Sequence, residues 1–416
     1  MIAEIIATGD EIRSGALVDS NSAYIAEKLE EIGVEVARHS CVGDNMDMLV
    51  SVFKEVSARC DIAIVTGGLG PTVDDLTTAA IAKAAGRQLV LDETALRSVE
   101  DFFKARNRKM TYSNKKQAML PEGCKRLDNL MGTAPGFVIK TGRCSFFCIP
   151  GVPFEMRRML SDSVLPEIEK SEHKKRKFCF VKTLSTFGLT ESATGEKLVG
   201  LSDEFPDIKL GLRAKFPEIH IKLYANGEDE EYLRNVLEKG CEWVLQKIGS
   251  RVISSNGESM EAVVARILCD RKETVALAES CTGGLISNRL TNIAGSSEFF
   301  LFSGVTYSND AKMKVLNVLP ETLKAYGAVH EETVKQMAAR ARDVAGATYG
   351  LATSGIAGPD GGTDEKPVGA LCIGIATSER VKGMRFCFPG GKRLMNKSIF
   401  ATTALDVLRR ELVYDL

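Results

Sequence analysis

An alternation between two kinds of segment runs through the first 90 residues and constrains the fold more than any other feature. Short apolar runs of strand type take turns with longer amphipathic runs of helical type. This order is typical of a parallel sheet covered by helices, so we expect the α/β class. The expected strands are residues 2–8, 34–38 and 61–66, and the expected helices are residues 21–32, 45–58 and 74–85.

The length of 416 residues predicts several domains, because a single core stops growing near ~250 to 300 residues. We expect three domains, residues 1–170, 171–252 and 253–416. A polar and basic stretch at 171–177 marks the first boundary. The middle domain has two strand-like stretches and one long helical stretch, enough for a small α+β module. In the third domain the alternation of strands and helices resumes and ends in a helix at 395–412.

Composition and charge exclude several classes of protein. Lys and Arg total 54 and Asp and Glu total 55, so the formal charge of −1 gives no overall attraction to nucleic acids or anionic membranes. No stretch reaches the ~18 apolar residues of a membrane span. The 11 cysteines include no CxxC pair, and the four histidines lack the spacing of zinc helices. We therefore expect a cytoplasmic protein with reduced thiols, in which carboxylates would hold any metal ion.

The first candidate site follows the strand at 61–66. Gly67, Gly68 and Gly70 would let backbone N–H groups approach a phosphate, and a helix N-terminus would add its positive dipole end. The alternative is a tight strand-to-helix turn with Asp74 as the helix cap.

Carboxylates from two other strand ends favour the phosphate site. Asp10 and Glu11 follow the first strand and Asp44 follows the second, so all three should meet the glycine turn at one edge of the sheet. Several carboxylates beside a phosphate repel each other unless a divalent cation lies between them. Such a site suits metal-assisted cleavage of a pyrophosphate.

The second candidate site begins at Ser280, directly after the apolar strand 274–279. A hydroxyl at a strand end, with Gly283, Gly284 and a helix N-terminus behind it, can act as a nucleophile beside an oxyanion site. Two alternatives stay open. Ser280 can simply cap the helix, and Cys281 can be the nucleophile, although a lone cysteine in such a turn usually packs in the core.

A serine nucleophile needs a base, and Lys312 is the candidate. It lies four residues after Ser308 on one predicted helix face, and burial would let it lose its proton near neutrality, with Tyr307 relaying or donating a hydrogen bond. The alternative is a solvated surface lysine. The glycine-rich loop at 354–363 could wrap a ribose phosphate, with Arg393 as the charge clamp.

Separated motifs in the first domain resemble the CinA family, whose N-terminal domain is similar to the MoaB/MogA (molybdopterin-binding) fold. They are Gly9-Asp10-Glu11, Val42-Gly43-Asp44, Gly67 to Thr77, Asn114 to Gln117, Gly132 to Gly136 and Pro150 to Pro153. The resemblance implies a metal-dependent ADP-ribose pyrophosphatase, with Asp44 and Asp75 as the acidic, metal-binding pair. A divalent metal ion is the implied cofactor, with K+ as a further candidate. The implied substrate contacts are Gly9, Asp10, Glu11, Gly67, Gly68, Gly70, Thr72, Asp74 and Thr133.

The third domain resembles the CinA C-terminal domain, through Ala278 to Gly284, Ala294 to Ser297, Gly304 to Asn309, Tyr326 to Val329, Ser354 to Gly362 and Glu365 to Gly369. That resemblance implies a nicotinamide mononucleotide (NMN) deamidase without a cofactor. Ser280 would be the nucleophile, with Lys312 and Tyr307 as its activating partners. The implied substrate contacts are Thr282, Gly283, Gly284, Ser354, Gly355, Gly358 and Arg393. Lys392 and Lys397 stand where the family commonly has Asp and Arg.

The middle domain resembles the KH-like linker of full-length CinA proteins, most clearly at residues 213–220. It contains no GXXG spacing, so binding of nucleic acid is not expected, and the basic run 174–177 is expected to be a solvated connection. A spacer or dimer element is the favoured interpretation, with a homodimer as the expected assembly. The alternative to a two-site nucleotide hydrolase is a non-catalytic nucleotide- or molybdopterin-binding scaffold linked to competence or DNA damage.

Overall fold

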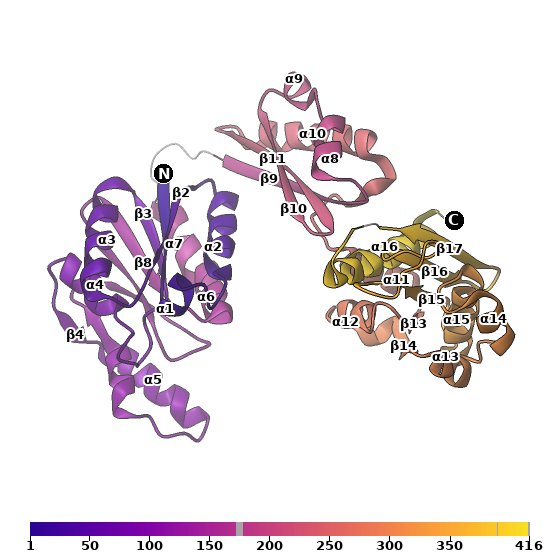
Figure 1. Ribbon diagram of the computed structural model, residues 1–416. Coiled ribbons are helices and arrows are strands. Elements are labelled where there is room, and N and C mark those ends of the chain that lie inside the picture. The colour runs from indigo at the N-terminus through magenta and orange to yellow at the C-terminus, as the bar shows by residue number, and fades with distance from the viewer. Residues whose placement is uncertain (172–177, 389, 415–416) are drawn as a thin grey trace. The chain divides into compact units, whose positions relative to one another are not determined.

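The computed structural model describes residues 1–171, 178–388 and 390–414 (Figure 1). The basic run 174–177 and His173 lie outside the described residues. The chain divides into two compact units, one made of Met1–Val181 and Tyr224–Leu237 and the other of Lys182–Leu223 and Glu238–Leu416. Each unit contains its own sheet with helices on both faces, as the α/β class requires.

The first unit is built on a six-stranded sheet of order β2-β1-β3-β8-β7-β6. The four strands β2, β1, β3 and β8 are parallel, and β7 and β6 extend the sheet in antiparallel fashion. The bounds are β1 Ile2–Thr8, β2 Glu35–Val42, β3 Ile62–Thr66, β6 Lys125–Leu127, β7 Gly136–Thr141 and β8 Cys144–Ile149. The parallel strands predicted from the sequence are therefore present, and β2 is longer than expected.

Helices cover both faces of this sheet (Figure 1). Successive residues of a strand face opposite sides, so Ile6 packs with α3 and α4 while Ile5 packs with α2, α6 and α7. The bounds are α1 Asp10–Arg13, α2 Ser20–Glu31, α3 Met46–Arg59, α4 Thr77–Ala84, α5 Glu93–Ala105, α6 Pro153–Met159 and α7 Leu165–Ser171. A π-helical turn, η2 Leu160–Val164, joins α6 to α7. A 3-10 segment, η1 Tyr112–Ala118, precedes the small pair of β4 Leu89–Leu91 with β5 Met119–Pro121.

The helix predicted at 74–85 begins three residues later, at Thr77. The carboxylate of Asp75 accepts hydrogen bonds from the backbone N–H and the hydroxyl of Thr72, which folds the chain back into a loop before the helix. The helix cap at Asp74, which was part of the alternative to a phosphate site, is therefore not formed. The N-cap position is occupied by Leu76, which provides no side-chain cap.

The middle segment forms a four-stranded sheet of order β10-β11-β9-β12. The bounds are β9 Phe178–Phe187, α8 Glu191–Lys197, α9 Leu201–Glu204, β10 Ile208–Lys215, β11 Glu218–Gly227, α10 Glu230–Ile248, η3 Gly249–Arg251 and β12 Val252–Ser254. This is the small α+β module that the sequence predicts, with two strands, β10 and β12, that the sequence analysis did not find.

The last part of the chain is built on a five-stranded sheet of order β14-β13-β15-β16-β17. Strand β13 is parallel to both neighbours, and β16 and β17 are antiparallel additions. The strands are β13 Val275–Glu279, β14 Phe300–Val305, β15 Tyr349–Gly355, β16 Ala370–Ala376 and β17 Val381–Cys387. Along β13, Leu277 packs on the side of α11, α12 and α16, whereas Ala278 packs on the side of α15.

The helices of this part are α11 Met260–Arg271, α12 Leu285–Thr291, α13 Asn309–Leu316, α14 Pro320–Tyr326, α15 Glu331–Ala345 and α16 Arg393–Tyr414, with the 3-10 turn η4 Ser296–Glu298. No helix within residues 1–171, 178–388 and 390–414 is both long enough and apolar enough to cross a membrane.

Candidate active sites

Ser280 is the first residue after β13, an interior strand of the five-stranded sheet. Its backbone N–H donates to the carbonyl of Thr353 on the neighbouring strand β15, over 3.0 Å. This bond continues the β13–β15 ladder by one residue and fixes the backbone that carries the hydroxyl. Ser280 is buried, with 8% of its surface exposed.

Lys312 meets Ser280 from helix α13. The hydroxyl of Ser308 accepts from the N–H of Ala311 and caps the helix, so Lys312 follows one turn later, as the spacing predicts. Its Nζ lies 3.1 Å from Ser280 Oγ. Lys312 is 0% exposed, and burial lowers the pKa of its amine to about 8. The alternative of a solvated surface lysine is therefore wrong.

Two backbone carbonyls complete the surroundings of the Lys312 amine. Nζ is 2.8 Å from the oxygen of Thr306 and 3.2 Å from that of Tyr307. A protonated amine has three N–H donors for these carbonyls and for Ser280 Oγ. A neutral amine keeps two N–H groups for the carbonyls and directs its lone pair at the serine hydroxyl. The same three contacts thus serve both protonation states, which is what a proton acceptor for Ser280 requires.

Glu279, which the sequence analysis did not single out, anchors the turn between β13 and α12 that contains Ser280. Its buried carboxylate accepts from the backbone N–H groups of Gly284, Ile286 and Ser287, at 2.8–3.2 Å, and from the Ser287 hydroxyl at 2.5 Å. The N-terminus of α12 is therefore already occupied. The expectation that it would hold an oxyanion is wrong, and so is the alternative that Ser280 caps this helix, because Gly284 occupies the N-cap position.

Cys281 and Thr282 both point into the core. Cys281 is 5% exposed and burial raises the pKa of its thiol to about 12, so the thiol stays protonated at neutral pH and is a poor nucleophile. The hydroxyl of Thr282, a predicted substrate contact, is fully buried and lies 2.9 Å from that of Thr353. Gly283 and Gly284 have φ of 59° and 87°, a backbone region that favours glycine and makes the tight turn possible.

Tyr307 and Arg393 form the exposed side of the site. Tyr307 reaches Lys312 through its carbonyl, whereas its phenol, on a side chain that is 59% exposed, accepts from Arg393 Nη2 at 3.1 Å. Arg393 Nη1 donates to the carbonyl of Gly358 at 2.6 Å and so ties the start of α16 to the glycine-rich loop. Of the other predicted loop contacts, Ser354 is buried and a side chain at Gly355 would collide with the backbone of Ala370.

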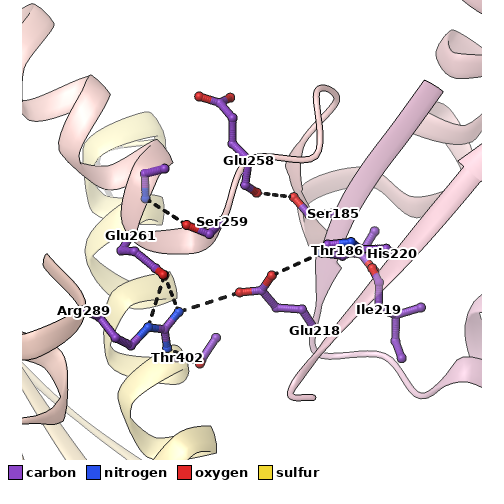
Figure 2. Close-up of polar contacts among 11 residues, drawn as sticks. Ser185, Thr186, Glu218, Ile219, His220, Glu258, Ser259, Glu261, Arg289 and Thr402 are labelled. Atoms are coloured by element: carbon purple, nitrogen blue, oxygen red, sulfur yellow. Dashed lines mark hydrogen bonds and ion pairs between the residues drawn. The ribbon is translucent and has the colours of Figure 1, made fainter. Parts of the chain in front are cut away.

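Helix α12 follows the turn that contains Ser280. Side-chain contacts of Arg289, near the C-terminal end of α12, fix the helix to its neighbours. Figure 2 shows Arg289 of α12 between Glu261 and Glu218. Arg289 Nη2 lies 2.5 Å from Glu261 of α11 and 3.7 Å from Glu218 of β11, and Nη1 donates to Thr402 of α16 at 2.6 Å. A strand of the middle module and two helices of the last part thus share one guanidinium within the second unit.

The first unit contains a cavity of about 570 Å³ at the carboxyl ends of the parallel strands. Of the residues predicted for this site, the cavity is lined by Gly9, Glu11, Asp44, Gly67, Gly68, Gly70, Asp74, Asp75 and Thr133. Strand ends that are distant in sequence therefore meet at one edge, as the sheet topology predicts. Asp10 and Thr72 do not line the cavity, because Asp10 pairs with Arg13 at 2.9 Å and Thr72 is bonded to Asp75.

Both the backbone conformation and the close approach of neighbouring atoms require glycine at positions of this site. Gly67 and Gly68 have φ of 106° and 66°. A Cβ on Gly67 would lie 2.5 Å from the carbonyl oxygen of Thr8, and one on Gly70 would lie 2.5 Å from the carboxylate of Asp75. A side chain at either position would displace the strand end or the loop that forms the wall of the cavity.

The carboxylates of this cavity repel one another. Burial and the nearby charges of Asp10, Glu11 and Asp74 raise the pKa of Asp44, although its carboxylate accepts a hydrogen bond from the N–H of Asp10 at 3.0 Å. In the part of the chain that the structure describes, no three His, Cys, Asp or Glu side chains come together as a metal-binding group. Carboxylate oxygens are the donors that a hard cation such as Mg²⁺ prefers, and such a cation can bind through one or two carboxylates with water and substrate phosphates in the rest of its shell.

Two polar residues of this cavity were missed as site residues. The Nδ2 of Asn21 donates to the carbonyl of Gly151 at 2.7 Å, while its Oδ1 is buried without a hydrogen-bond partner among the described residues. Gln117 Nε2 donates to the hydroxyl of Thr133 at 3.0 Å. Gln117 stands inside a motif quoted for the resemblance above, whereas Asn21 gave no signal beyond its place at the start of a predicted helix.

Comparison with family models places three matches in order along the chain. The models are described as a probable molybdopterin binding domain at residues 4–170, the damage-inducible protein CinA KH domain at 181–253 and the CinA C-terminal domain at 257–412. A "CinA-like protein" of Desulfosudis oleivorans is 51% identical over 413 residues, which are 99% of this chain and 100% of the relative. The chain belongs to the CinA family.

Two further proteins are similar to this chain. A "putative competence-damage inducible protein" of Caldicellulosiruptor bescii is 40% identical and covers 99% of this chain and 100% of its own length. The crystal structure of a CinA protein of unknown function from Thermoplasma acidophilum is 34% identical, at a TM-score of 0.37, and covers 41% of this chain and 96% of its own.

The anchoring role of Glu279 predicts a loss of stability in Glu279→Gln. The amide keeps one acceptor oxygen but turns an N–H group toward donors that are already buried, which costs about 1–3 kcal/mol. We expect the melting temperature of the second unit to fall by roughly 2–10 °C in thermal denaturation of the full chain. The exposed Glu379→Gln is the matched control, and an unchanged melting curve for Glu279→Gln would contradict the role.

Proposed function

We propose that the second unit is an NMN amidohydrolase that releases ammonia and nicotinate mononucleotide. The observation that carries this proposal is the fully buried Lys312 amine, 3.1 Å from Ser280 Oγ, with a pKa lowered to about 8. A serine paired with such a lysine is suited to acyl transfer from an amide, and the family's C-terminal domain is the part of the chain that contains the pair.

In the proposed acylation step, Ser280 Oγ attacks the carbonyl carbon of the nicotinamide while its proton passes to the neutral Lys312 amine. The tetrahedral intermediate collapses as the Lys312 ammonium returns this proton to the departing nitrogen, which leaves as ammonia. In the deacylation step, Lys312 takes a proton from water, the hydroxide attacks the ester, and the proton restores Ser280. The products are ammonia and a pyridine carboxylic acid, which gives its proton to ammonia or to water at neutral pH, and the enzyme regains its starting protonation state.

The oxyanion of the intermediate needs donors close to Ser280. Glu279 occupies the N–H groups of Gly284, Ile286 and Ser287, and the N–H of Gly283 donates to the carbonyl of Ser280. The remaining backbone donors of the turn are those of Cys281 and Thr282. We assign the oxyanion to these two N–H groups, which the Glu279 anchor would hold in a fixed orientation.

Cations near the turn are suited to the phosphate of a mononucleotide. The Nζ of Lys397 lies next to Gly283, since a Cβ on that glycine would be 3.4 Å from it. Arg393 is held by Gly358 and Tyr307 on the other side. Together they support selection of a nucleotide over free nicotinamide, because a pyridine amide alone has no negative charge to contact them.

For the first unit, the cavity supports cleavage of the pyrophosphate of ADP-ribose with a divalent cation. Asp44 and Asp75 would hold the cation, and when bound it would neutralise the phosphates and polarise the bond to be cleaved. The wall formed by Gly67, Gly68 and Gly70 lets the backbone approach phosphate oxygens without side chains in between. Asn21 also lines the cavity, and its Oδ1 has no hydrogen-bond partner among the described residues.

Replacing either member of the Ser280–Lys312 pair should abolish NMN deamidation. We expect Ser280→Ala and Lys312→Arg each to lower kcat by roughly 10³-fold or more, because arginine keeps the positive charge but cannot accept a proton. The assay measures ammonia enzymatically and nicotinate mononucleotide by chromatography. Cys281→Ala is the control and should retain activity. Loss of turnover in Cys281→Ala together with full turnover in Ser280→Ala would reassign the nucleophile, and no turnover in the unmodified protein would favour a non-catalytic scaffold.

The deamidation rate should depend on the protonation of Lys312. The neutral amine is the active form, so kcat/KM should rise with pH and level off above about pH 8, with a fall of about tenfold per pH unit below that value. Steady-state kinetics on NMN across this range measures the profile. A profile that is flat through pH 8, or one that rises with pH only near the ordinary lysine pKa, would reject Lys312 as the base.

In the first unit, removal of one charge should reduce metal-dependent cleavage of ADP-ribose. We expect Asp44→Asn and Asp75→Asn to lower the rate of AMP formation by about 100-fold with Mg²⁺ present. The side-chain amide oxygen in Asp75→Asn can still accept from the Thr72 N–H, so this isosteric change removes charge while it preserves the loop. The exposed Asp47→Asn in the same unit is the control. Equal rates in Asp75→Asn and Asp47→Asn would remove Asp75 from the site.

A further inference from the structure

The second unit contains another cavity, of about 610 Å³, that none of the chemistry above uses. This volume lies in the range of about 300–1,000 Å³ that is typical of small-molecule sites. Helix α16 runs from the proposed active site to this cavity. The helix contributes Arg393 at its first turn to the proposed active site, whereas the cavity is lined by Thr403 and later residues, about 15 Å further along the helix axis.

One wall of the cavity is a face of the edge strand β17. Lys382, Met384 and Phe386 alternate along the strand and therefore point to the same side, and Phe388 continues the row. The rings of Phe386 and Phe388 are nearly parallel, with an interplanar angle of 12° and centroids 6.5 Å apart. This wall therefore contains two stacked aromatic rings, with a lysine further along the same row.

The other walls come from two separate parts of the second unit. Val407 of α16 faces the cavity opposite the sheet, and Phe187 at the end of β9 adds an apolar surface from the middle module. Arg251 lies beside Phe187, and its guanidinium donates to the carbonyl of Gly188, another lining residue. The cavity therefore exists only where three segments distant in sequence meet.

The charges around this cavity are not balanced. Its two carboxylates are already paired, since Asp406 binds both Arg409 and Arg410, at 2.7 and 2.8 Å, and Glu411 binds Arg380 at 2.6 Å. The exposed cations Lys382 and Arg251 stand at the rim in addition to these pairs. The result is an apolar interior with an excess of positive charge at its opening.

We propose that this cavity binds a planar aromatic anion, that is, a flat ring system with one carboxylate, sulfonate or phosphate group. The parallel phenylalanine rings favour a ring over an aliphatic chain, because stacked or edge-on ring contacts add to the burial of apolar area. Lys382 and Arg251 select an anion over a neutral or cationic ring. A bound ligand would touch the middle module, β17 and α16 together, so it would favour their packed arrangement.

A fluorescent aromatic sulfonate, 8-anilinonaphthalene-1-sulfonate, is a direct probe, because its emission rises when it leaves water for an apolar site. Titration of the full chain should reveal a saturable binding component. The double variant Arg251→Glu/Lys382→Glu should weaken that component at least about tenfold. The control, Lys324→Glu/Arg340→Glu, makes the same charge change at exposed positions away from the cavity and should bind as the unmodified chain does. Any probe that binds in the cavity of the first unit would bind equally in both variants. Its signal can therefore be distinguished from binding at the cavity beside β17.

Two further arms test the shape and chemistry of the ligand. Val407→Trp fills the cavity and should abolish the component, provided that its thermal denaturation shows a folded protein. 2-Naphthoate should displace the probe, whereas decanoate, an aliphatic carboxylate, should not. Equal probe affinity in the two charge variants, or displacement by decanoate alone, would overturn the proposal. None of these readouts measures turnover, so they test the proposed binding site independently of the proposed amidohydrolase activity.

Discussion

The second unit depends on one contact, that between the buried Lys312 amine and Ser280. A buried ammonium loses its hydration, which is why its pKa falls to about 8, and the carbonyls of Thr306 and Tyr307 make that burial tolerable. The contact demands that both partners be fixed. The β13–β15 ladder holds Ser280, the Ser308 cap sets the start of the helix that carries Lys312, and Glu279 anchors the turn between strand and helix.

Both units place their candidate sites at the carboxyl ends of parallel strands, yet the loops there make different chemistry. In the first unit the strand ends are followed by glycines and unpaired carboxylates such as Asp44, which leave an open, anionic cavity that suits a cation and phosphates. In the second unit the carboxylate at the end of β13, Glu279, is bonded to backbone N–H groups, and the amine of Lys312 lies next to Ser280. Shared topology therefore sets the place of a site and the loop residues set its chemistry.

The sequence predicted those features that depend on the local periodicity of apolar residues, such as the positions of strands. Strand β1 lies where the pattern placed it. Lys312 was chosen as the partner of Ser280 because a serine nucleophile needs a base and because the family resemblance implies it, and the two side chains do meet. The start of α4 was wrong because a hydrogen bond from Thr72 to Asp75 competes with the helix, and propensity does not register such a bond. Glu279 was missed because its partners are backbone groups. The cavity beside β17 could not be predicted from the sequence, because its lining residues come from three segments that are distant along the chain.

The most direct test of the central contact is a measurement of the Lys312 pKa itself. The side-chain carbon next to Nζ, labelled with ¹³C, can be followed by NMR through a pH titration of the full chain, with Lys312→Arg to assign the signal. The burial of this amine predicts a midpoint at about 8. A midpoint near the ordinary lysine value of about 10.4 would show an amine that stays charged at neutral pH and would contradict its role as the base for Ser280.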